Sequence, residues 1–316
     1  MQHRSPPTYR LLPLDTSVAH PARTTASSPR RSLLERARSG STAGDPVAIE
    51  RFEHLLEIVE GLGSCVLALS GGIDSSFLLA VASPLLGERC LALTADSAAV
   101  PAWDRADAAV AAGEARRFGA RWRTVPTKEL DDPRYAHNPR SRCYFCKLEV
   151  YGAASAIARA EGYAWVIDGT NASDTQRLDR PGMTAASELR VRSPLAEAGI
   201  TKEQLRGLAR SLGVDGWDRP ASACLASRIP FGDLITAERL RRVEAAELAL
   251  RALGFRQVRV RDFGSHARVE VEADELTDLE GRSADVQTRL VELGFESWSP
   301  AAYAGTGAGD SPNAYG

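Results

Sequence analysis

The sequence predicts an α/β protein with a doubly wound, mostly parallel sheet, followed by a smaller C-terminal α+β domain. Three observations support this fold class. A short apolar run at 65–69 ends at a Ser-Gly-Gly turn and leads into helix-forming residues, the order of strand, loop and helix. Further apolar runs alternate with helical stretches up to about residue 168. From residue 237 onward, this alternation of strands and helices gives way to a long amphipathic stretch and two runs with period-2 alternation.

The predicted elements of the larger region follow one another regularly. Strands are expected at 65–69, 90–95, 121–125 and 164–168, and helices over 76–82, 106–118 and 148–161. Each strand is short and apolar, and turn residues separate it from the next helical stretch. Such alternation places the strands in one parallel sheet with helices on both faces.

The last third is predicted to hold helices at 237–253 and 284–293 and strands at 256–261 and 267–272. In the first of these strands, alternation places Val258 and Val260 on one face and Arg259 and Arg261 on the other. We therefore divide the chain into four regions. They are a disordered extension over 1–45, a nucleotide-binding α/β domain over 46–232, a small α+β domain for substrate binding or oligomerisation over 233–300, and a disordered tail over 301–316.

Composition excludes several classes of protein. The 316 residues are 44% hydrophobic and 25% charged, which suffices for a buried core, and the net charge of -2 argues against nucleic acid as a partner. No uninterrupted apolar run reaches the roughly 18 residues that a membrane helix needs. Five cysteines in a chain of this length do not make a disulfide scaffold, so we expect a reducing, cytoplasmic location. The Arg-, Ser- and Pro-rich start is compatible with a transit peptide, but it lacks an amphipathic run, which favours disorder.

The turn after the first strand is predicted to bind phosphate. Its sequence is Ser70-Gly71-Gly72-Ile73-Asp74-Ser75-Ser76. Glycines let the backbone approach a phosphate closely, and the following helix presents N–H groups and the positive end of its dipole. The serines add hydroxyl donors, and Asp74 is placed to hold Mg²⁺ and to help cap the helix. The alternative is an ordinary Gly-Gly turn, and no Lys-Ser or Lys-Thr pair follows that would make a Walker A loop.

A second polar turn follows the strand at 164–168. It consists of Asp168, Gly169, Thr170 and Asn171, and Asp174 comes shortly after. Because the carboxyl ends of parallel strands meet at one edge of the sheet, we expect this turn to lie beside the glycine loop. The alternative is an Asx-type turn that binds no ligand.

Three cysteines are candidates for chemistry. Cys143 and Cys146 form a Cys-x-x-Cys among the cations Arg140, Arg142 and Lys147, and such a field favours the thiolate. Cys224 lies four residues before Arg228, which would share its face if the segment is helical.

The same three thiols suit metal binding. They can hold an iron–sulfur cluster with one open iron, or zinc with His137 or water as a fourth ligand. The alternative is a purely structural role for these thiols, since a lone Cys-x-x-Cys is weakly specific. Cys65 and Cys90 lie inside apolar strands and are interpreted as small buried hydrophobes.

The glycine loop resembles the signature of the pyrophosphate-loop ATPases, which implies cleavage of ATP between the α and β phosphates and the corresponding adenine nucleotide alpha hydrolase-like fold. Other segments match in order and narrow the resemblance. They are 138–147, 169–171, 180–183, 193–195 and 219–232. With these, residues 50 to about 275 resemble the LarE family of ATP-dependent sulfur transferases, whose most specific segment is Cys224-Leu-Ala-Ser-Arg-Ile-Pro.

The resemblance implies adenylation of a carboxylate on pyridinium-3,5-biscarboxylate mononucleotide, followed by attack of sulfur to leave a thiocarboxylate. In family members with only the last cysteine, the residue matching Cys224 gives up its own sulfur and becomes dehydroalanine. In members with all three cysteines, the resemblance implies a [4Fe–4S] cluster that relays sulfide. This chain has Cys143, Cys146 and Cys224, so the cluster variant is predicted. The family also implies a homo-oligomer, with a hexamer as one form, and requires sulfide or another sulfur donor as a partner.

The resemblance also suggests that Arg228, Arg259 and Arg261 hold the substrate phosphate. The alternative for Arg259 and Arg261 is cross-strand pairing with Glu270 and Glu272. At Asp262 and the Phe that follows it, this sequence differs from the His-rich motif typical of the family. The resemblance therefore does not define the detailed contacts to the substrate.

Other functions remain as alternatives. An iron–sulfur-dependent tRNA thiolase combines the same loop with three cysteines, but the mildly acidic chain lacks an evident RNA-binding module. A non-catalytic nucleotide-binding or zinc-stabilised protein would bind ATP without releasing pyrophosphate. An amidating synthetase would need a source of ammonia, and no glutaminase-like region is present.

Overall fold

The computed structural model of the chain describes residues 28–40, 44–175, 181–219 and 223–303. The described residues fall into two compact units. Unit 1 takes the described residues of Met1–Ser97, Trp103–Lys128 and Cys143–Arg219, and unit 2 takes those of Ala98–Ala102, Glu129–Arg142 and Pro220–Gly316. No described helix is both long and apolar enough to cross a membrane.

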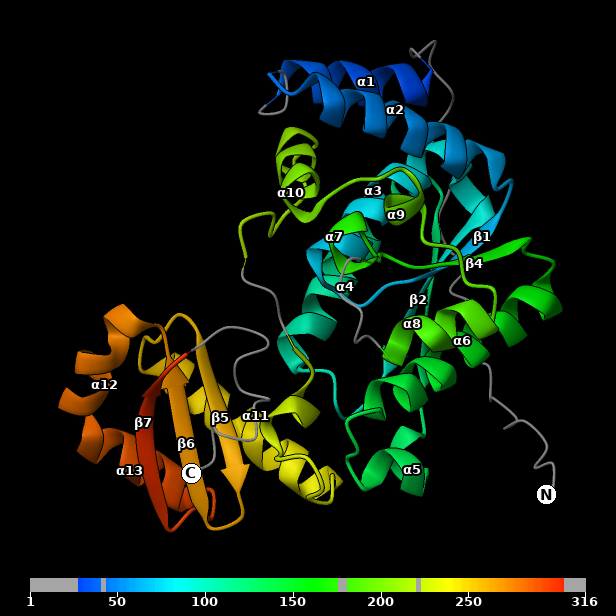
Figure 1. Cartoon of the computed structure of the whole chain (residues 1–316). Coiled ribbons are helices and arrows are strands. Elements are labelled where there is room, and N and C mark those ends of the chain that lie inside the picture. The colour runs from blue at the N-terminus through cyan, green and yellow to red at the C-terminus, as the bar shows by residue number, and fades with distance from the viewer. Residues whose placement is uncertain (1–27, 41–43, 176–180, 220–222, 304–316) are drawn as a thin grey trace, which may run out of the picture. The chain divides into compact units, whose positions relative to one another are not determined.

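Unit 1 is built on a four-stranded sheet with the order β3-β2-β1-β4, in which every pair of neighbours is parallel (Figure 1). The strands are β1 (Cys65–Ala68), β2 (Cys90–Asp96), β3 (Arg121–Pro126) and β4 (Trp165–Ile167). Its helices are α1 (Pro29–Ser39), α2 (Pro46–Gly61), α3 (Ile73–Leu86), η1 (Gly87–Arg89), α4 (Ala102–Arg116), α6 (Arg142–Glu161), α7 (Ala172–Thr175), α8 (Pro181–Glu188), α9 (Pro194–Glu197) and α10 (Lys202–Ser211). The predicted parallel α/β fold is confirmed.

Both faces of this sheet are buried, as parallel sheets require. Cys65 and Leu67 of β1 pack into a cluster with α1 to α4, α9 and α10. Val66, between them, faces the other side and packs with Ala153 and Ile157 of α6. Successive residues of one strand therefore enter two different cores, which explains the uninterrupted apolar run in the sequence.

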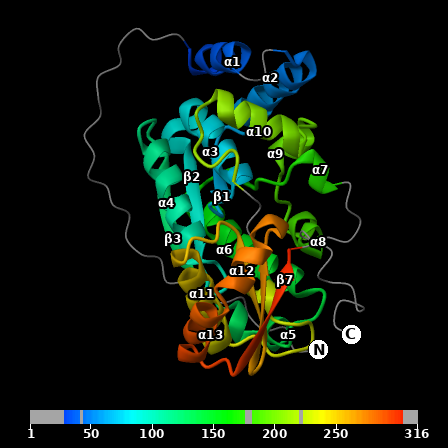
Figure 2. The same ribbon diagram turned by 90° about the vertical axis from the view of Figure 1, so that its left-hand side faces the viewer.

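Helix α1 lies within the range 1–45, for which the sequence predicted disorder. Its N-cap Ser28 accepts a hydrogen bond from Arg31 N at 3.3 Å, and Leu33 and Ala37 are buried. Arg30 makes ion pairs with Glu57 and Glu60 of α2, and Figures 1 and 2 both show α1 beside α2. A short helix of this kind is stabilised mainly by tertiary packing, here against α2, and the Arg-rich sequence alone did not predict that packing. The predicted disorder elsewhere in 1–27 and in the tail beyond residue 303 lies outside the described residues.

Unit 2 contains the predicted small α+β domain. Its sheet has the order β5-β6-β7, with β5 (Val258–Phe263) antiparallel to β6 (His266–Val271) and β7 (Ser297–Ala302) parallel to β6. The helices are η2 (Glu129–Asp131), α5 (Pro133–Ala136), η3 (Leu225–Arg228), α11 (Ala237–Ala252), η4 (Ala273–Glu275), α12 (Leu276–Gly281) and α13 (Ser283–Glu292). Val258, Val260 and Val269 join the core with α11, α12 and α13.

Two features of unit 2 differ from the predicted boundaries. Strand β7 extends past residue 300 and was not predicted, because its Ser- and Pro-containing sequence suits only an edge strand. The segments 98–102, 129–142 and 223–232 belong to unit 2, whereas the sequence assigned them to the α/β domain over 46–232. Hydrogen bonds between distant segments, such as Leu225 N to Ala99 O at 2.8 Å, explain this grouping, and no local pattern reveals them.

Candidate functional site

The glycine loop joins β1 to α3 at the carboxyl edge of the sheet of unit 1. Gly71 has a φ of 84°, and a Cβ at this position would collide with the backbone carbonyl of Asp104. Gly72 is the N-cap of α3, and none of the described side chains caps this helix. The first N–H groups of α3 are therefore left for an external acceptor, as in helix N-termini that bind anions.

The serines of the loop divide into two kinds. Ser75 is buried, and its hydroxyl accepts from Ser70 N at 3.2 Å, donates to Gly72 O at 3.0 Å and lies 3.1 Å from the Ser70 hydroxyl. Ser75 thus holds the shape of the loop, and Ser76 is buried in the first turn of α3. Ser70 is exposed and is the serine of the loop that faces solvent.

The turn after β4 lies against the loop, as the parallel topology predicted. A Cβ on Gly169 would come within 2.7 Å of Ser75 N, so only glycine permits this approach. Thr170 N and Thr170 Oγ1 both donate to Asp168, at 3.1 and 2.9 Å. The Asx-type turn considered from the sequence is therefore present, and it places Asn171 over the loop.

Asp74 is the centre of a charged cluster. Asn171 Nδ2 donates to Asp74 at 3.2 Å and to Asp174 at 2.9 Å, and Lys202 Nζ donates to both carboxylate oxygens of Asp74 at 2.8 and 2.6 Å. Asp74 therefore pairs with a lysine and does not cap α3, which corrects part of its predicted role. Two carboxylates and an amide fit Mg²⁺, which proteins hold through one or two carboxylates together with the phosphates of a substrate.

Lys202 is a site residue that the sequence reading missed. It is the first residue of α10, directly after Thr201, which forms a capping box with Gln204. The Thr-x-x-Gln pattern predicts the start of a helix. The pairing of Lys202 with Asp74, 128 positions away, could not be predicted, because it depends on how α10 packs against α3.

A buried network lies behind the turn at Asp168. Asp168 accepts hydrogen bonds from Tyr151 of α6 and, at 2.7 Å, from Ser193. Burial raises the pKa of Tyr151 above its usual range. Tyr151 and then Asp168 hold the pKa of Lys147 above its ordinary value despite burial, so Lys147 keeps its charge. Lys147 follows Cys146 directly and lies over the Tyr151 ring at 5.0 Å.

The candidate cysteines belong to different units. Cys143 and Cys146 occupy the first turn of α6 in unit 1, three residues apart and so on one side of the helix; Cys143 is exposed and Cys146 half-buried. Cys224 directly precedes η3 in unit 2 and is half-buried. Among the described residues, no group of three His, Cys, Asp or Glu side chains is arranged to hold a metal ion. As a donor set, two accessible thiols on one helical turn suit an iron–sulfur centre or zinc.

The other two cysteines match their prediction as buried hydrophobes. Cys65 and Cys90 are fully buried, lie opposite each other on β1 and β2, and have sulfur atoms 3.9 Å apart. The contact with Cys90, together with burial, raises the pKa of the Cys65 thiol well above its usual value. Such a thiol stays protonated and unreactive.

In unit 2, Arg228 and Arg261 bind the backbone of the segment that carries Cys224. We define the arginine cluster as Arg228, Arg259, Arg261 and Arg268. Arg228 forms two hydrogen bonds, at 2.7 and 3.0 Å, with the fully buried Glu247. Its other branch donates to Ala223 O at 2.7 Å and Cys224 O at 3.3 Å. Arg228 is thus close to Cys224, as predicted. It binds the backbone carbonyl of Cys224, directly before the 3-10 helix η3.

Arg259 and Arg261 have different roles. Arg261 pairs with Glu270 at 2.6 Å, which is the cross-strand pairing considered from the sequence, and donates to Ser227 O at 3.1 Å. Arg259 makes no ion pair within the described part of the chain; its guanidinium stacks on Tyr303 at 4.2 Å and is 5% exposed. Burial first, and the nearby Arg228 next, lower the pKa of Arg259. The buried guanidinium of Arg259 is thus the group of this cluster best suited to bind an anion such as a phosphate.

The fold and the loop together define a class: a parallel α/β protein with a glycine loop and an uncapped helix N-terminus at the carboxyl edge of its sheet. No protein-family model matches the chain. An uncharacterized protein of Synechocystis is 41% identical over 72% of this chain and 83% of its own length. An uncharacterized protein of Methanocaldococcus jannaschii is 27% identical over 73% of this chain and 86% of its own.

A third relative carries a functional name. The pyridinium-3,5-bisthiocarboxylic acid mononucleotide synthase of Lactiplantibacillus plantarum is 33% identical over 76% of this chain and 86% of its own length. The chain therefore belongs to the LarE family of sulfur transferases, as the sequence resemblance predicted.

Proposed function

We propose that this chain is an ATP-dependent sulfur transferase that adenylates the carboxylates of pyridinium-3,5-biscarboxylic acid mononucleotide and converts them to thiocarboxylates. The product name of the synthase relative supports the substrate. The observation that carries ATP use is the uncapped N-terminus of α3, at a loop where Gly71 leaves no room for a Cβ and against which the turn at Gly169 packs just as closely.

In the adenylation step, a carboxylate oxygen of the substrate forms a bond to the α-phosphorus of ATP. The bond from that phosphorus to the bridging oxygen breaks, and pyrophosphate leaves. The amides at the start of α3 stabilise negative charge on the phosphates. Lys202 Nζ, 2.6 Å from Asp74, supplies a cation at the same place. Asp74, Asn171 and Asp174 would hold Mg²⁺, which neutralises phosphate charge when bound.

In the sulfur step, a sulfur nucleophile forms a bond to the acyl carbon, and AMP leaves with the electron pair of the broken carbon–oxygen bond. Cys143, Cys146 and Cys224 would hold a [4Fe–4S] cluster, which supplies sulfide when bound. The competing source is Cys224 itself. Its thiolate would form a thioester, and loss of the α-proton with cleavage of the Cβ–S bond would leave a thiocarboxylate and dehydroalanine. Arg228 and Arg261 hold the backbone around Cys224 in either case.

Arg259 is proposed to bind the substrate phosphate, helped by Arg228 and Arg261. Its buried charge has no ion pair among the described residues and gains most from an incoming anion, because Arg228 and Arg261 already pair with Glu247 and Glu270. From the family resemblance, we also propose that the chain forms a homo-oligomer and receives sulfur from an external donor.

The test is to purify the chain without oxygen, to quantify iron and acid-labile sulfide, and to incubate it with ATP and the mononucleotide. We expect iron with sulfide, pyrophosphate release that depends on both substrates, and a thiocarboxylate product. ATP binding without pyrophosphate release would refute the enzyme. Loss of sulfur and two hydrogens from Cys224 in single-turnover mass spectra would replace the cluster with the sacrificial mechanism.

A further inference from the structure

The segment that follows Cys224 is held by contacts far from it in sequence. Residues 229–235 form a loop between η3 and α11, within unit 2. Loop backbones of this kind stay in place only when other groups satisfy their N–H and C=O groups. The position of the Cys224 turn therefore depends on what binds this loop.

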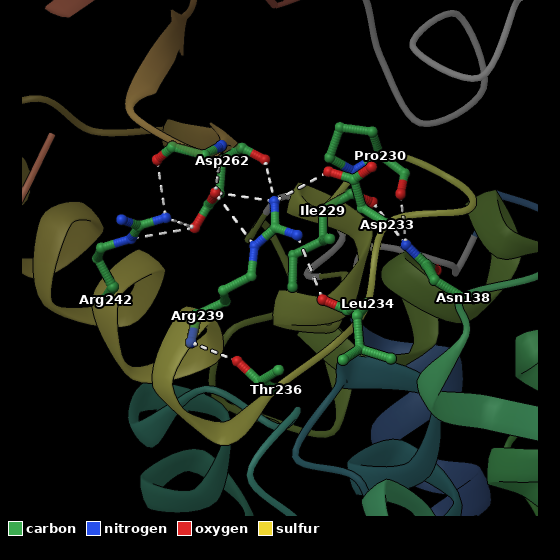
Figure 3. Close-up of polar contacts among 10 residues, drawn as sticks. Asn138, Ile229, Pro230, Asp233, Leu234, Thr236, Arg239, Arg242 and Asp262 are labelled. Atoms are coloured by element: carbon green, nitrogen blue, oxygen red, sulfur yellow. Dashed lines mark hydrogen bonds and ion pairs between the residues drawn. The ribbon is translucent and has the colours of Figure 1, made fainter. Parts of the chain in front are cut away.

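Asn138 binds one side of the loop (Figure 3). Its side-chain amide donates to Ile229 O at 3.0 Å and to Pro230 O at 2.7 Å, while its backbone carbonyl accepts from Gly232 N at 3.1 Å. The residue is fully buried and has a φ of 52°, a left-handed conformation that Asn tolerates better than most residues. No other side chain in the described ranges bonds to both Ile229 O and Pro230 O.

Arg142 fixes the orientation of this amide. Its guanidinium donates to Asn138 Oδ1 at 3.0 Å, and because arginine is only a donor, the amide nitrogen must face the loop carbonyls. The same guanidinium lies over the ring of Phe231 in the loop, at 4.4 Å. Arg142 is the first residue of α6 and immediately precedes Cys143.

The far end of the loop is held by Arg239. This side chain donates to Leu234 O at 3.2 Å and to the fully buried Asp262 at 2.9 Å, and it pairs with Asp233 at 3.1 Å. Arg242 also binds Asp262, at 2.6 Å (Figure 3). The loop end is thereby tied to β5, the strand that carries Arg259 and Arg261.

We propose that Asn138 is a positioning residue for sulfur transfer, which sets the place of the Cys224 segment and fixes the residue before Cys143 through Arg142. This inference rests on the proposed function for its catalytic meaning. The positioning itself does not depend on the proposed function, because it predicts how the accessibility of the Cys224 thiol changes when the Asn138 amide is replaced. Asn138 touches no reacting atom and acts through the loop.

The experiment compares Asn138→Asp, Asn138→Gly and Asp233→Ala in the full chain. Asn138→Asp keeps the acceptor for Arg142 and removes both donors to the loop. Asn138→Gly keeps the left-handed backbone and removes the side chain. Asp233→Ala is the matched control, since it removes a half-exposed ion pair of the same loop and leaves the Asn138 bonds intact.

The readouts are the alkylation rate of each cysteine by iodoacetamide, followed by mass spectrometry, the affinity for ATP, and thiocarboxylate formation. In both Asn138 variants we expect Cys224 alkylation to accelerate several-fold while the buried Cys65 and Cys90 stay protected. Thiocarboxylate formation should fall about ten- to a hundredfold, the scale of an ångström-sized misplacement. ATP affinity and the behaviour of Asp233→Ala should match the wild type.

An unchanged Cys224 alkylation rate in either folded Asn138 variant overturns the proposal. Joint exposure of Cys65, Cys90 and Cys224 overturns it as well, because Asn138 would then support the whole fold. If the wild type makes no thiocarboxylate, the proposed function fails, while the alkylation rates still decide whether Asn138 positions Cys224.

Discussion

The candidate site of unit 1 is formed by backbone amides, whereas that of unit 2 is formed by guanidinium groups. In the glycine loop the shape of the chain makes the site, because Gly71 and Gly169 allow approaches that a Cβ would block. In the arginine cluster the side chains make the site, and buried glutamates hold them in place. Substitutions that alter the backbone should therefore act most strongly on the glycine loop, and substitutions that alter charge should act most strongly on the arginine cluster.

The largest expected effect concerns charge balance in unit 2. Arg228→Met should leave Glu247 buried without its partner and lower the free energy of unfolding by about 3–5 kcal/mol, the usual result of breaking a buried pair. Chemical denaturation measures this. The double variant Arg228→Met with Glu247→Met should recover much of the loss. If the single and double variants are equally destabilised, the pair contributes through packing alone.

The next effect concerns backbone shape in unit 1. Gly71→Ala should lower ATP-dependent pyrophosphate release about a hundredfold, because the new Cβ displaces the loop from the backbone at Asp104. Gly162→Ala is the matched control, since Gly162 has a similar positive φ of 75° but no neighbouring atom within 4 Å of an added Cβ. Equal losses in both variants would mean that backbone strain, and not the close approach, is responsible.

The next prediction concerns Lys202, the side-chain cation that pairs with Asp74 beside the glycine loop. Lys202→Ala should weaken ATP binding by about tenfold or more, the scale of a charge-assisted hydrogen bond. Calorimetry with ATP and Mg²⁺ measures it, and Glu203→Ala, in the same helical turn but exposed, should bind ATP as the wild type does. Undiminished affinity in Lys202→Ala would confine Lys202 to its ion pair with Asp74.

The smallest effect is expected at Arg259. Arg259→Ala should weaken binding of the mononucleotide about tenfold and leave ATP binding unchanged, because it removes a proposed phosphate partner and breaks no ion pair among the described residues. Arg256→Ala serves as the control, since Arg256 is exposed and pairs with Asp274 and Glu275. Equal mononucleotide affinity in Arg259→Ala and the wild type would remove Arg259 from the site.

Much of unit 1 was predictable because its signals are local. The apolar run before the Ser-Gly-Gly turn predicted β1, the loop and α3, and parallel topology predicted that the turn at Gly169 would lie against the loop. The pairing of Asp74 with Lys202 was not predictable, because α10 packs on α3 through tertiary contacts that leave no periodic trace. Strand β7 was missed for a related reason, since an edge strand with Pro300 lacks strand composition.

The arginine cluster shows the same division. Alternation in β5 predicted that Arg259 and Arg261 share a face, but the choice between pairing and anion binding was open. In the structure the two residues differ: Arg261 forms an ion pair with Glu270, and Arg259 stacks on the ring of Tyr303. The antiparallel register places Glu270 opposite Arg259, yet Glu270 pairs diagonally with Arg261, while Arg259 lies over Tyr303, directly after β7. Alternation alone does not predict either contact.

Short patterns of apolar residues, glycines and motifs are enough to predict the parallel α/β fold, the glycine loop and the family. Which charges are matched and what holds Cys224 in place depend on tertiary packing. Asn138 and the loop at 229–235 lie about ninety residues apart along the chain, yet they satisfy each other's buried polar groups. Such pairings arise when the chain folds and distant backbones must find partners away from water.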